Sequence, residues 1–186
     1  AVQAVSFVNP QRVPGMADAE AVAHALSRRP GVRYTATWLN LRGLERALAT
    51  PLDVQGSLQI SASERFSQSN TGKDTAQTLS EQRRVIEFCQ ARGLPIQSAI
   101  VMTAFGCNIE GPTAPARVVE RVGQLLDLLA EYGLTLPTLR LADTVGWASP
   151  NAVAAVVGAV RERWPDLTLG LHLHDTRGTG LANALM

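Results

Sequence analysis

The segment LTLGLHLHDTRGTG, residues 167–180, joins a short apolar stretch to two histidines at the point where that stretch ends. Residues 167–174 are predicted to form a strand, and side chains alternate between the two faces of a strand. His172 and His174 therefore share one face, and three leucines share the other: Leu169, Leu171 and Leu173. The polar, glycine-rich residues that follow are typical of a binding loop.

Outward from this segment, strand-like and helix-like stretches alternate along the whole chain. Strands are predicted at 2–8, 31–39, 54–61, 96–104, 138–144 and 167–174. Amphipathic helices are predicted between them at 17–29, 41–49, 75–93, 114–133 and 149–164. Strict alternation of this kind predicts parallel strands joined by right-handed helical crossovers.

Chain length helps to choose between the two α/β folds that fit this pattern, a doubly wound sheet and a TIM (β/α)₈ barrel. A complete barrel takes roughly 250 residues, or about 31 for each βα unit, so about six units fill this chain. The first predicted strand is followed by a loop with one glycine, at Gly15, which is not a dinucleotide-binding or P-loop pattern. The expected fold class is α/β, a partial TIM (β/α)₈ barrel.

Composition narrows the class of protein. Seventeen basic and sixteen acidic residues give a net charge of +1, which does not suggest a partner among the nucleic acids. Two cysteines make no disulfide framework, and we expect reduced thiols and a cytoplasmic location. The longest nearly apolar run, 151–160, is too short to span a membrane. The chain opens without Met and ends inside a helical pattern, so we expect one barrel domain over 1–186, incomplete at both ends.

Polar residues that could carry chemistry follow several of the strands. Two imidazoles two residues apart can share one metal ion, and the alternative is a pair of core histidines bonded to the backbone. Asp143 ends the fifth strand, where a carboxylate could bind a substrate hydroxyl or move a proton, or simply cap the next turn. Cys107, after the fourth strand, is more typical of a small buried residue than of a reactive thiol.

Two further loops have open interpretations. Asn9, Gln11 and Arg12 could meet an anionic ligand or belong to a solvated loop. Residues 61–74, rich in small polar side chains, could line a site or merely connect two elements. Polar residues at the carboxyl ends of five strands are the pattern of a barrel enzyme.

Four motifs resemble one family. The chain is similar to 3-hydroxy-3-methylglutaryl-CoA lyases, metal-dependent TIM-barrel lyases related to isopropylmalate and homocitrate synthases. The similar segments are SFVNPQRVPGMAD (6–18), FGCNIEG (105–111), ADTVGWASP (142–150) and HLHDTRGTGLAN (172–183). The last two are shared with the synthases, whereas the first two are specific to the lyases.

The resemblance implies an activity and a site. His172 and His174 would be two ligands of a catalytic divalent cation, Mg²⁺ or Mn²⁺, and Asp143 would contact the substrate near its reacting hydroxyl. The reaction would be retro-Claisen cleavage of an acyl-CoA to acetyl-CoA and acetoacetate or a related keto product, as in leucine catabolism. A homodimer would be expected of the full-length protein.

The chain also departs from the family pattern. The family's first strand carries an arginine and an aspartate metal ligand, and its later part carries a catalytic cysteine loop and an asparagine ligand, none of which fall within residues 1–186. Gln3 stands where the lyases have a glutamate. We therefore expect residues 1–186 alone to be inactive. The alternatives are a condensing synthase similar to isopropylmalate synthase and a non-catalytic barrel relative.

Overall fold

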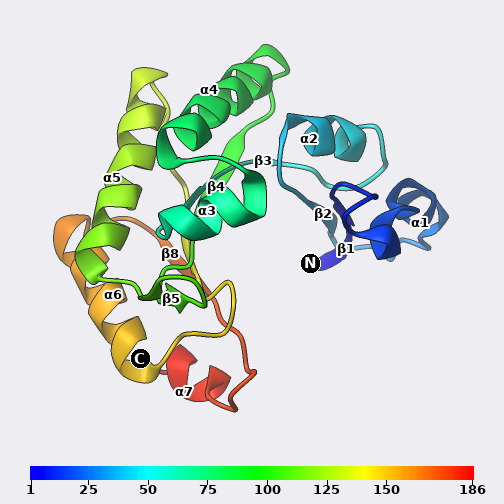
Figure 1. The fold of residues 1–186 in the computed structure, drawn as a ribbon. Coiled ribbons are helices and arrows are strands. Elements are labelled where there is room, and N and C mark those ends of the chain that lie inside the picture. Colours follow the sequence, from blue (N-terminus) through cyan, green and yellow to red (C-terminus); the bar gives the residue numbers. More distant parts are fainter. The chain divides into compact units, whose positions relative to one another are not determined.

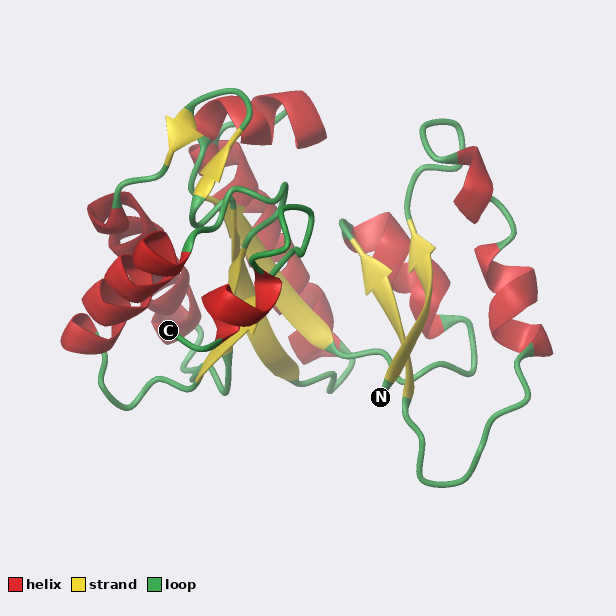
Figure 2. Cartoon of the chain, turned by 90° about the horizontal axis from the view of Figure 1, so that it is seen from below, coloured by secondary structure: helices red, strands yellow, loops and turns green.

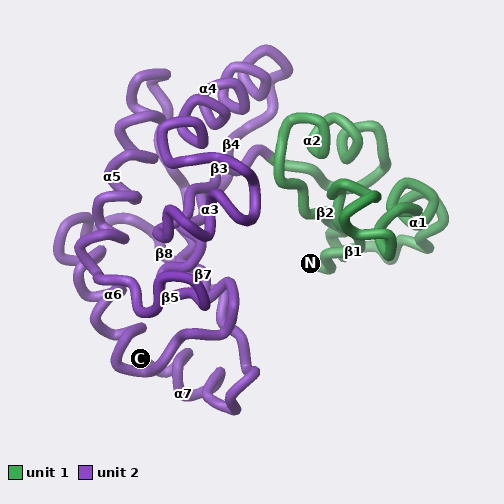
Figure 3. The backbone as a smooth tube through the Cα atoms, viewed as in Figure 1, with its two compact units in different colours: residues 1–55 green, residues 56–186 purple.

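The computed structural model describes all 186 residues, which form two compact units, residues 1–55 and 56–186 (Figure 3). Each unit has its own parallel sheet and its own helices. None of these helices combines the length and the apolar character needed to cross a membrane.

Unit 1, residues 1–55, is built on two parallel strands. Strand β1 (Val2–Phe7) pairs with β2 (Tyr34–Trp38), and the short 3-10 helix η1 (Pro14–Met16), helix α1 (Ala19–Ala25) and helix α2 (Leu41–Leu48) complete the unit (Figure 1). A small apolar core holds these elements together: Val5, Phe7, Ala19, Ala23, Tyr34, Ala47 and Leu52.

Local signals explain where the helices of unit 1 begin and end. Helix α1 is shorter than the predicted 17–29, because Leu26 already has an extended backbone with ψ of 125°. Helix α2 begins at Asn40, whose side chain accepts the Gly43 N–H at 2.9 Å. A Cβ at Gly43 would lie 2.6 Å from the Phe7 carbonyl oxygen, so only glycine allows α2 to approach β1 this closely.

Unit 2, residues 56–186, contains a four-stranded parallel sheet. Its strands lie in the order β3 (Gly56–Ser61), β4 (Ile96–Met102), β7 (Leu139–Ala142) and β8 (Leu169–His172). Its helices are α3 (Glu64–Thr71), α4 (Thr75–Ala91), α5 (Pro115–Glu131), α6 (Pro150–Arg163) and α7 (Gly180–Ala184), seen in red in Figure 2.

The two faces of this sheet differ in burial. Alternate strand residues are completely buried on the face on which helices α4 and α5 pack: Leu58, Ile60, Ala99, Val101, Leu139 and Leu141. Burial of each large side chain contributes roughly 1.5–3 kcal/mol. The opposite face carries more exposed residues, including Gln59, Ile100 and Arg140. Because the strands are parallel, their carboxyl ends lie along one edge of the sheet.

The six predicted strands are confirmed, and each runs parallel to the strand it pairs with. Strand β8 ends at His172, two residues earlier than predicted. Leu171, predicted to face the helical layer, is 40% exposed because β8 is the edge strand of its sheet.

Residues 61–74, expected to line a site or merely to connect two elements, contain helix α3 at Glu64–Thr71, which was not predicted. Ser63 starts this helix, with its hydroxyl accepting the Phe66 N–H at 3.0 Å. Gly72 ends it in the left-handed conformation, at φ of 72°. Small polar residues therefore act here as helix caps as well as connectors.

A short antiparallel hairpin also interrupts the βα pattern after β4. Strands β5 (Gly106–Cys107) and β6 (Gly111–Pro112) form it, and they were not among the predicted strands. Gly106 has φ of 142°, and a Cβ there would lie 2.9 Å from the Trp147 ring. The hairpin therefore fits closely against the loop that follows β7.

Candidate functional site

Strands β7 and β8 bring three predicted site residues to one edge of the sheet. Ala142 and His172 are partners in the β7–β8 register, and the Asp143 N–H donates to the His172 carbonyl at 2.8 Å. Asp143, the first residue after β7, therefore lies next to His172, the last residue of β8. His174 follows two residues later in the chain.

The two imidazoles meet as the alternation of the strand predicts. Their Nε2 atoms are 3.2 Å apart, and the rings lie edge to face with centroids separated by 5.1 Å. Burial is the main cause that lowers the pKa of His172, the neighbouring His174 lowers it further, and Asp143 opposes the shift. A lowered pKa favours the neutral imidazole, which is the form that binds metals.

This geometry fits part of a metal site. Two ligand atoms that are each about 2.1 Å from one cation, at neighbouring positions of its shell, are about 3 Å apart. The separation of the two Nε2 atoms, 3.2 Å, matches that spacing. No group of three or more His, Cys, Asp or Glu side chains is arranged to hold a metal. The role of His172 and His174 as ligands stays a prediction.

Asp143 uses its two carboxylate oxygens differently. Oδ1 accepts the N–H groups of Trp147 at 2.6 Å and Ala148 at 3.0 Å, so this oxygen caps the turn after β7. Oδ2 is buried and accepts no hydrogen bond from the protein. Since buried polar atoms are nearly always paired, this unpaired carboxylate oxygen is an exception within the sheet edge that carries His172.

Thr103, directly after β4, has a backbone conformation that side chains rarely adopt. It is the one non-glycine residue with a positive φ, 53°, and it is completely buried. A β-branched residue in this region costs about 1–3 kcal/mol, so the surroundings must fix it. Its N–H donates to Thr144 Oγ1 at 2.8 Å, and its carbonyl accepts the Thr113 hydroxyl at 2.8 Å.

The Thr103 side chain reaches the loop after β3. Its Oγ1 lies 2.9 Å from Ser61 Oγ and accepts the Ser63 N–H at 3.0 Å. Cys107 extends this cluster, with its Sγ 3.2 Å from Ser63 Oγ. Cys107 is fully buried, which confirms its interpretation as a small buried residue.

The loops after β4, β7 and β8 contact one another beyond the histidines. The Trp147 indole N–H donates to Asn108 Oδ1 at 2.6 Å, and the Arg177 guanidinium lies 5.7 Å from the Trp147 ring centre. A Cβ at Gly146 would lie 2.3 Å from Thr176 Oγ1. The loops that carry Asp143 and His174 are therefore packed against each other.

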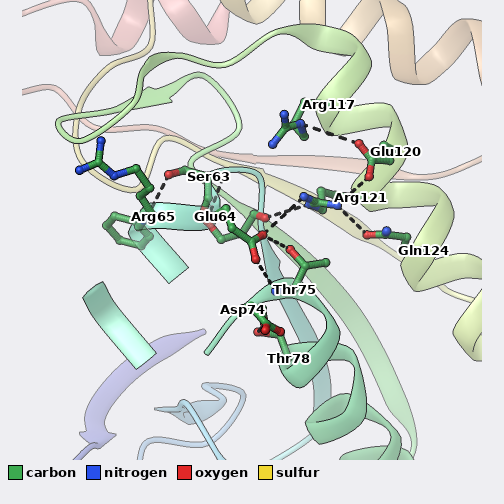
Figure 4. A network of polar contacts seen from close by, with 12 residues as sticks. Ser63, Glu64, Arg65, Asp74, Thr75, Thr78, Arg117, Glu120, Arg121 and Gln124 are labelled. Carbon is green, nitrogen blue, oxygen red and sulfur yellow. Dashed lines mark hydrogen bonds and ion pairs between the residues drawn. The ribbon is translucent and has the colours of Figure 1, made fainter. Parts of the chain in front are cut away.

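A second polar cluster lies beside the carboxyl end of β3. Arg121 of α5, only 6% exposed, donates from its guanidinium to the Ser61 carbonyl. The guanidinium also points toward Glu64, as Figure 4 shows. Thr75 donates both its N–H and its hydroxyl to Glu64. The Thr75 hydroxyl is the main cause that lowers the pKa of Glu64. This cluster fixes helix α3 to helices α4 and α5.

Unit 1 has a polar cavity of its own. It measures about 550 Å³ and is lined in part by Asn9 and Gln11, two of the residues predicted to meet an anion, whereas Arg12 does not line it. Its cationic residues are Arg42 and Arg46. Arg46 is bound through two nitrogens to Glu20, and this contact lowers the pKa of Glu20.

Sequence reasoning missed the residues that support Asp143. Thr103 lies at the end of a strand-like run, where a β-branched residue predicts extended backbone. The pairing of Thr103 with Thr144 joins residues 41 positions apart, which no local pattern reveals. The glycines at 106 and 146 were the available signals, since glycine often marks a close approach of the backbone.

Successive parallel βα units with polar residues at the carboxyl ends of their strands define a protein of the (β/α)₈-barrel class. Comparisons with known proteins agree. A family profile described as HMGL-like matches residues 13–186. The chain belongs to this family.

Named relatives and a solved structure point the same way. The chain is 37% identical over 182 residues to hydroxymethylglutaryl-CoA lyase YngG of Bacillus subtilis, covering 98% of this chain and 58% of that protein. It is 37% identical over 189 residues to (R)-citramalyl-CoA lyase of Chloroflexus aurantiacus, covering 96% and 57%. The crystal structure of the HMG-CoA lyase from Brucella melitensis matches with a TM-score of 0.84 at 34% identity, over 98% of this chain and 62% of that one.

These matches confirm the fold-class prediction of a partial TIM barrel. The chain spans a little over half the length of the curated relatives it matches. The family match therefore accounts for the lyase motifs in the sequence.

Proposed function

We propose that this chain supplies part of the active site of a divalent-metal-assisted acyl-CoA lyase of the hydroxymethylglutaryl-CoA lyase type. The observation that carries the proposal is the convergence of the His172 and His174 Nε2 atoms, 3.2 Å apart, at the sheet edge where Asp143 bonds the His172 carbonyl and keeps Oδ2 unpaired. Membership of a family whose relatives include carbon–carbon lyases supports it.

In the proposed reaction, His172 and His174 hold Mg²⁺ or Mn²⁺, which when bound supplies Lewis acidity toward the substrate's oxygens. The Asp143 carboxylate binds the tertiary hydroxyl of the substrate through Oδ2 and takes its proton. The carbon–carbon bond then breaks, its electron pair passes to the thioester as an enolate, and a ketone remains. Protonation of the enolate completes the acetyl-CoA product.

The fixed geometry of Asp143 suits this role. Its Oδ1 is held by two backbone N–H groups, so the carboxylate cannot rotate freely and Oδ2 keeps one direction. A proton acceptor held in place before the substrate arrives lowers the entropic cost of the reaction. Burial of Asp143, which is 1% exposed, also strengthens its hydrogen bonds with a bound hydroxyl.

The acyl group of the substrate is a separate question. Two relatives of equal identity are named for different substrates, hydroxymethylglutaryl-CoA and (R)-citramalyl-CoA. Gln3, which stands where the lyases have a glutamate, lies on β1 opposite Thr35. We propose 3-hydroxy-3-methylglutaryl-CoA as the substrate, with acetoacetate as the keto product, in a cytoplasmic homodimer that serves leucine catabolism.

The test measures cleavage by the intact protein with 3-hydroxy-3-methylglutaryl-CoA and with citramalyl-CoA, after chelation and after Mg²⁺ or Mn²⁺ is restored. His172→Ala and His174→Ala should each abolish cation-dependent cleavage and weaken Mn²⁺ binding. His24→Ala is the matched control, since His24 is the third histidine and lies exposed on α1. It should leave both properties unchanged.

Three results would contradict the proposal. Cleavage that survives loss of either histidine would remove the assigned ligands. Condensation of a keto acid with acetyl-CoA, without cleavage, would favour the synthase alternative. Binding of acyl-CoA with neither reaction would favour a non-catalytic relative.

A further inference from the structure

Three loops of unit 2 meet at Thr103, and one of them carries Asp143. The Thr103 N–H donates to Thr144 Oγ1 at 2.8 Å, and Thr144 directly follows Asp143. Next to this bond, the Ala104 N–H donates to the Ala142 carbonyl at 3.0 Å. The first two residues after β4 therefore hold the residues on both sides of Asp143.

The remaining contacts of Thr103 fix its own position. Its side-chain oxygen contacts Ser61 Oγ and accepts the Ser63 N–H, while its carbonyl accepts from Thr113. Together these bonds offset the energetic cost of the positive φ of Thr103, 53°. At this φ the side chain and the carbonyl of Thr103 reach Ser63 and Thr113, while its N–H faces Thr144.

We propose that Thr103 is a positioning residue that aims the Asp143 carboxylate through Thr144. The Thr103 N–H donates to Thr144 Oγ1, and this bond sets the start of the turn whose end Asp143 Oδ1 caps at Trp147 and Ala148. The direction of the unpaired Oδ2 follows from that turn. The inference rests on the proposed function of Asp143 and adds a residue that does not touch substrate.

The decisive variants remove one hydroxyl on each side of Thr103. Thr144→Val deletes the acceptor of the Thr103 N–H, and Thr113→Val deletes the donor to the Thr103 carbonyl, with little change of shape in either case. Each variant loses one hydrogen bond to the same residue. Only the first connects Thr103 to the Asp143 turn, so Thr113→Val is the matched control.

In the intact protein, Thr144→Val should lower kcat about 10-fold to 100-fold, since a misplacement of about 1 Å costs on that order. The KM for acyl-CoA and the affinity for Mn²⁺ should change less than about twofold, because binding groups are untouched. Thr144→Ser should restore kcat. Thr113→Val should lower the melting temperature but keep kcat.

A second measurement separates this inference from the proposed function. Amide hydrogen exchange at Trp147 and Ala148 reports whether Asp143 Oδ1 still caps its turn, whatever the reaction is. Exchange at both amides should accelerate in Thr144→Val and stay slow in Thr113→Val. Absence of cleavage by the wild-type protein, with this exchange pattern intact, would overturn the function and keep the positioning role. Equal kcat and equal exchange in the two variants would overturn the positioning role itself.

Discussion

Two polar clusters of unit 2 lie at carboxyl ends of strands, yet they differ in how completely their groups are paired. Around Arg121, the guanidinium binds the Ser61 carbonyl, Glu120 and Gln124, and Glu64 accepts from Thr75. Beside β7 and β8, Asp143 keeps one buried oxygen without a partner. The polar groups of the first cluster are paired within the chain, whereas the second keeps an unpaired oxygen, which the proposed function assigns to the substrate.

The two clusters show how residues that stabilise the fold can be distinct from residues that could carry out a reaction. Paired buried groups stabilise the protein, and a buried group left unpaired lowers its stability until a ligand arrives. Substitutions in the two clusters should therefore change different properties, and three experiments test this.

The largest effect is expected from Asp143→Asn. The amide keeps an oxygen that can accept from Trp147 and Ala148, but it cannot take a proton from a substrate. Cleavage should fall by about 10²–10⁴-fold, while the free energy of unfolding stays equal or rises, because a buried charge is removed. Steady-state kinetics and urea unfolding measure the two properties.

Asp143→Ala is the comparison for that experiment. It removes the cap as well as the charge, so it should lose both activity and stability, by about 1 kcal/mol for the cap. If Asp143→Asn lost as much stability as Asp143→Ala, the carboxylate would be a structural group and the contrast between the clusters would disappear.

The next effect concerns Arg121→Met. The methionine fills a similar volume but leaves the Ser61 carbonyl without its donor, so unfolding should become easier by about 2–3 kcal/mol. The activity of each folded molecule should be kept. Arg117→Ala is the control on the same helix, where an exposed pair with Glu120 at 3.8 Å is worth under about 1 kcal/mol. Equal destabilisation by the two variants would contradict the role given to burial.

The smallest effect is a pH dependence at Glu64. The Thr75 hydroxyl, the Thr75 N–H and the charges of Arg121 and Arg117 lower the pKa of Glu64 below 4.5 in the folded chain, although burial opposes them. A lowered pKa contributes stability that is present above the unfolded value and is lost as the pH falls through the folded value. Glu64→Gln should therefore be less stable than wild type near pH 7, and the difference should shrink as the pH falls through the folded pKa of Glu64. If the unfolding free energies of wild type and Glu64→Gln differed by the same amount at every pH, the contribution assigned to Glu64 would be contradicted.

The parts of the fold that repeat were predictable from sequence, because hydrophobic alternation is a local signal. The strands around Leu58 and Leu141 and the shared face of His172 and His174 follow from it. Helix α3 was missed because its caps, Ser63 and Gly72, look like ordinary loop residues until their hydrogen bonds are seen.

Of the candidate site, the sequence predicted the residues Asp143, His172 and His174 but not the contacts that surround them. Motif spacing pointed to Asp143 and the histidines, but the unpaired state of Oδ2 depends on which N–H groups surround the carboxylate in three dimensions. The positive φ of Thr103 runs against the intrinsic preference of a β-branched residue, so local sequence predicts the wrong conformation there.

The two cysteines of the chain, both in unit 2, could report local opening of that unit through thiol labelling. Cys89 and Cys107 are completely buried, and burial raises the pKa of the Cys89 thiol to about 11. Neither sulfur is therefore accessible to an alkylating reagent while the surrounding elements stay packed. The rate at which Cys89 is labelled would report how often α4 separates from the sheet. The rate at which Cys107 is labelled would report how often the β5–β6 hairpin opens. Unit 1, which has no thiol, would give no signal, so the labelling would report on unit 2 alone.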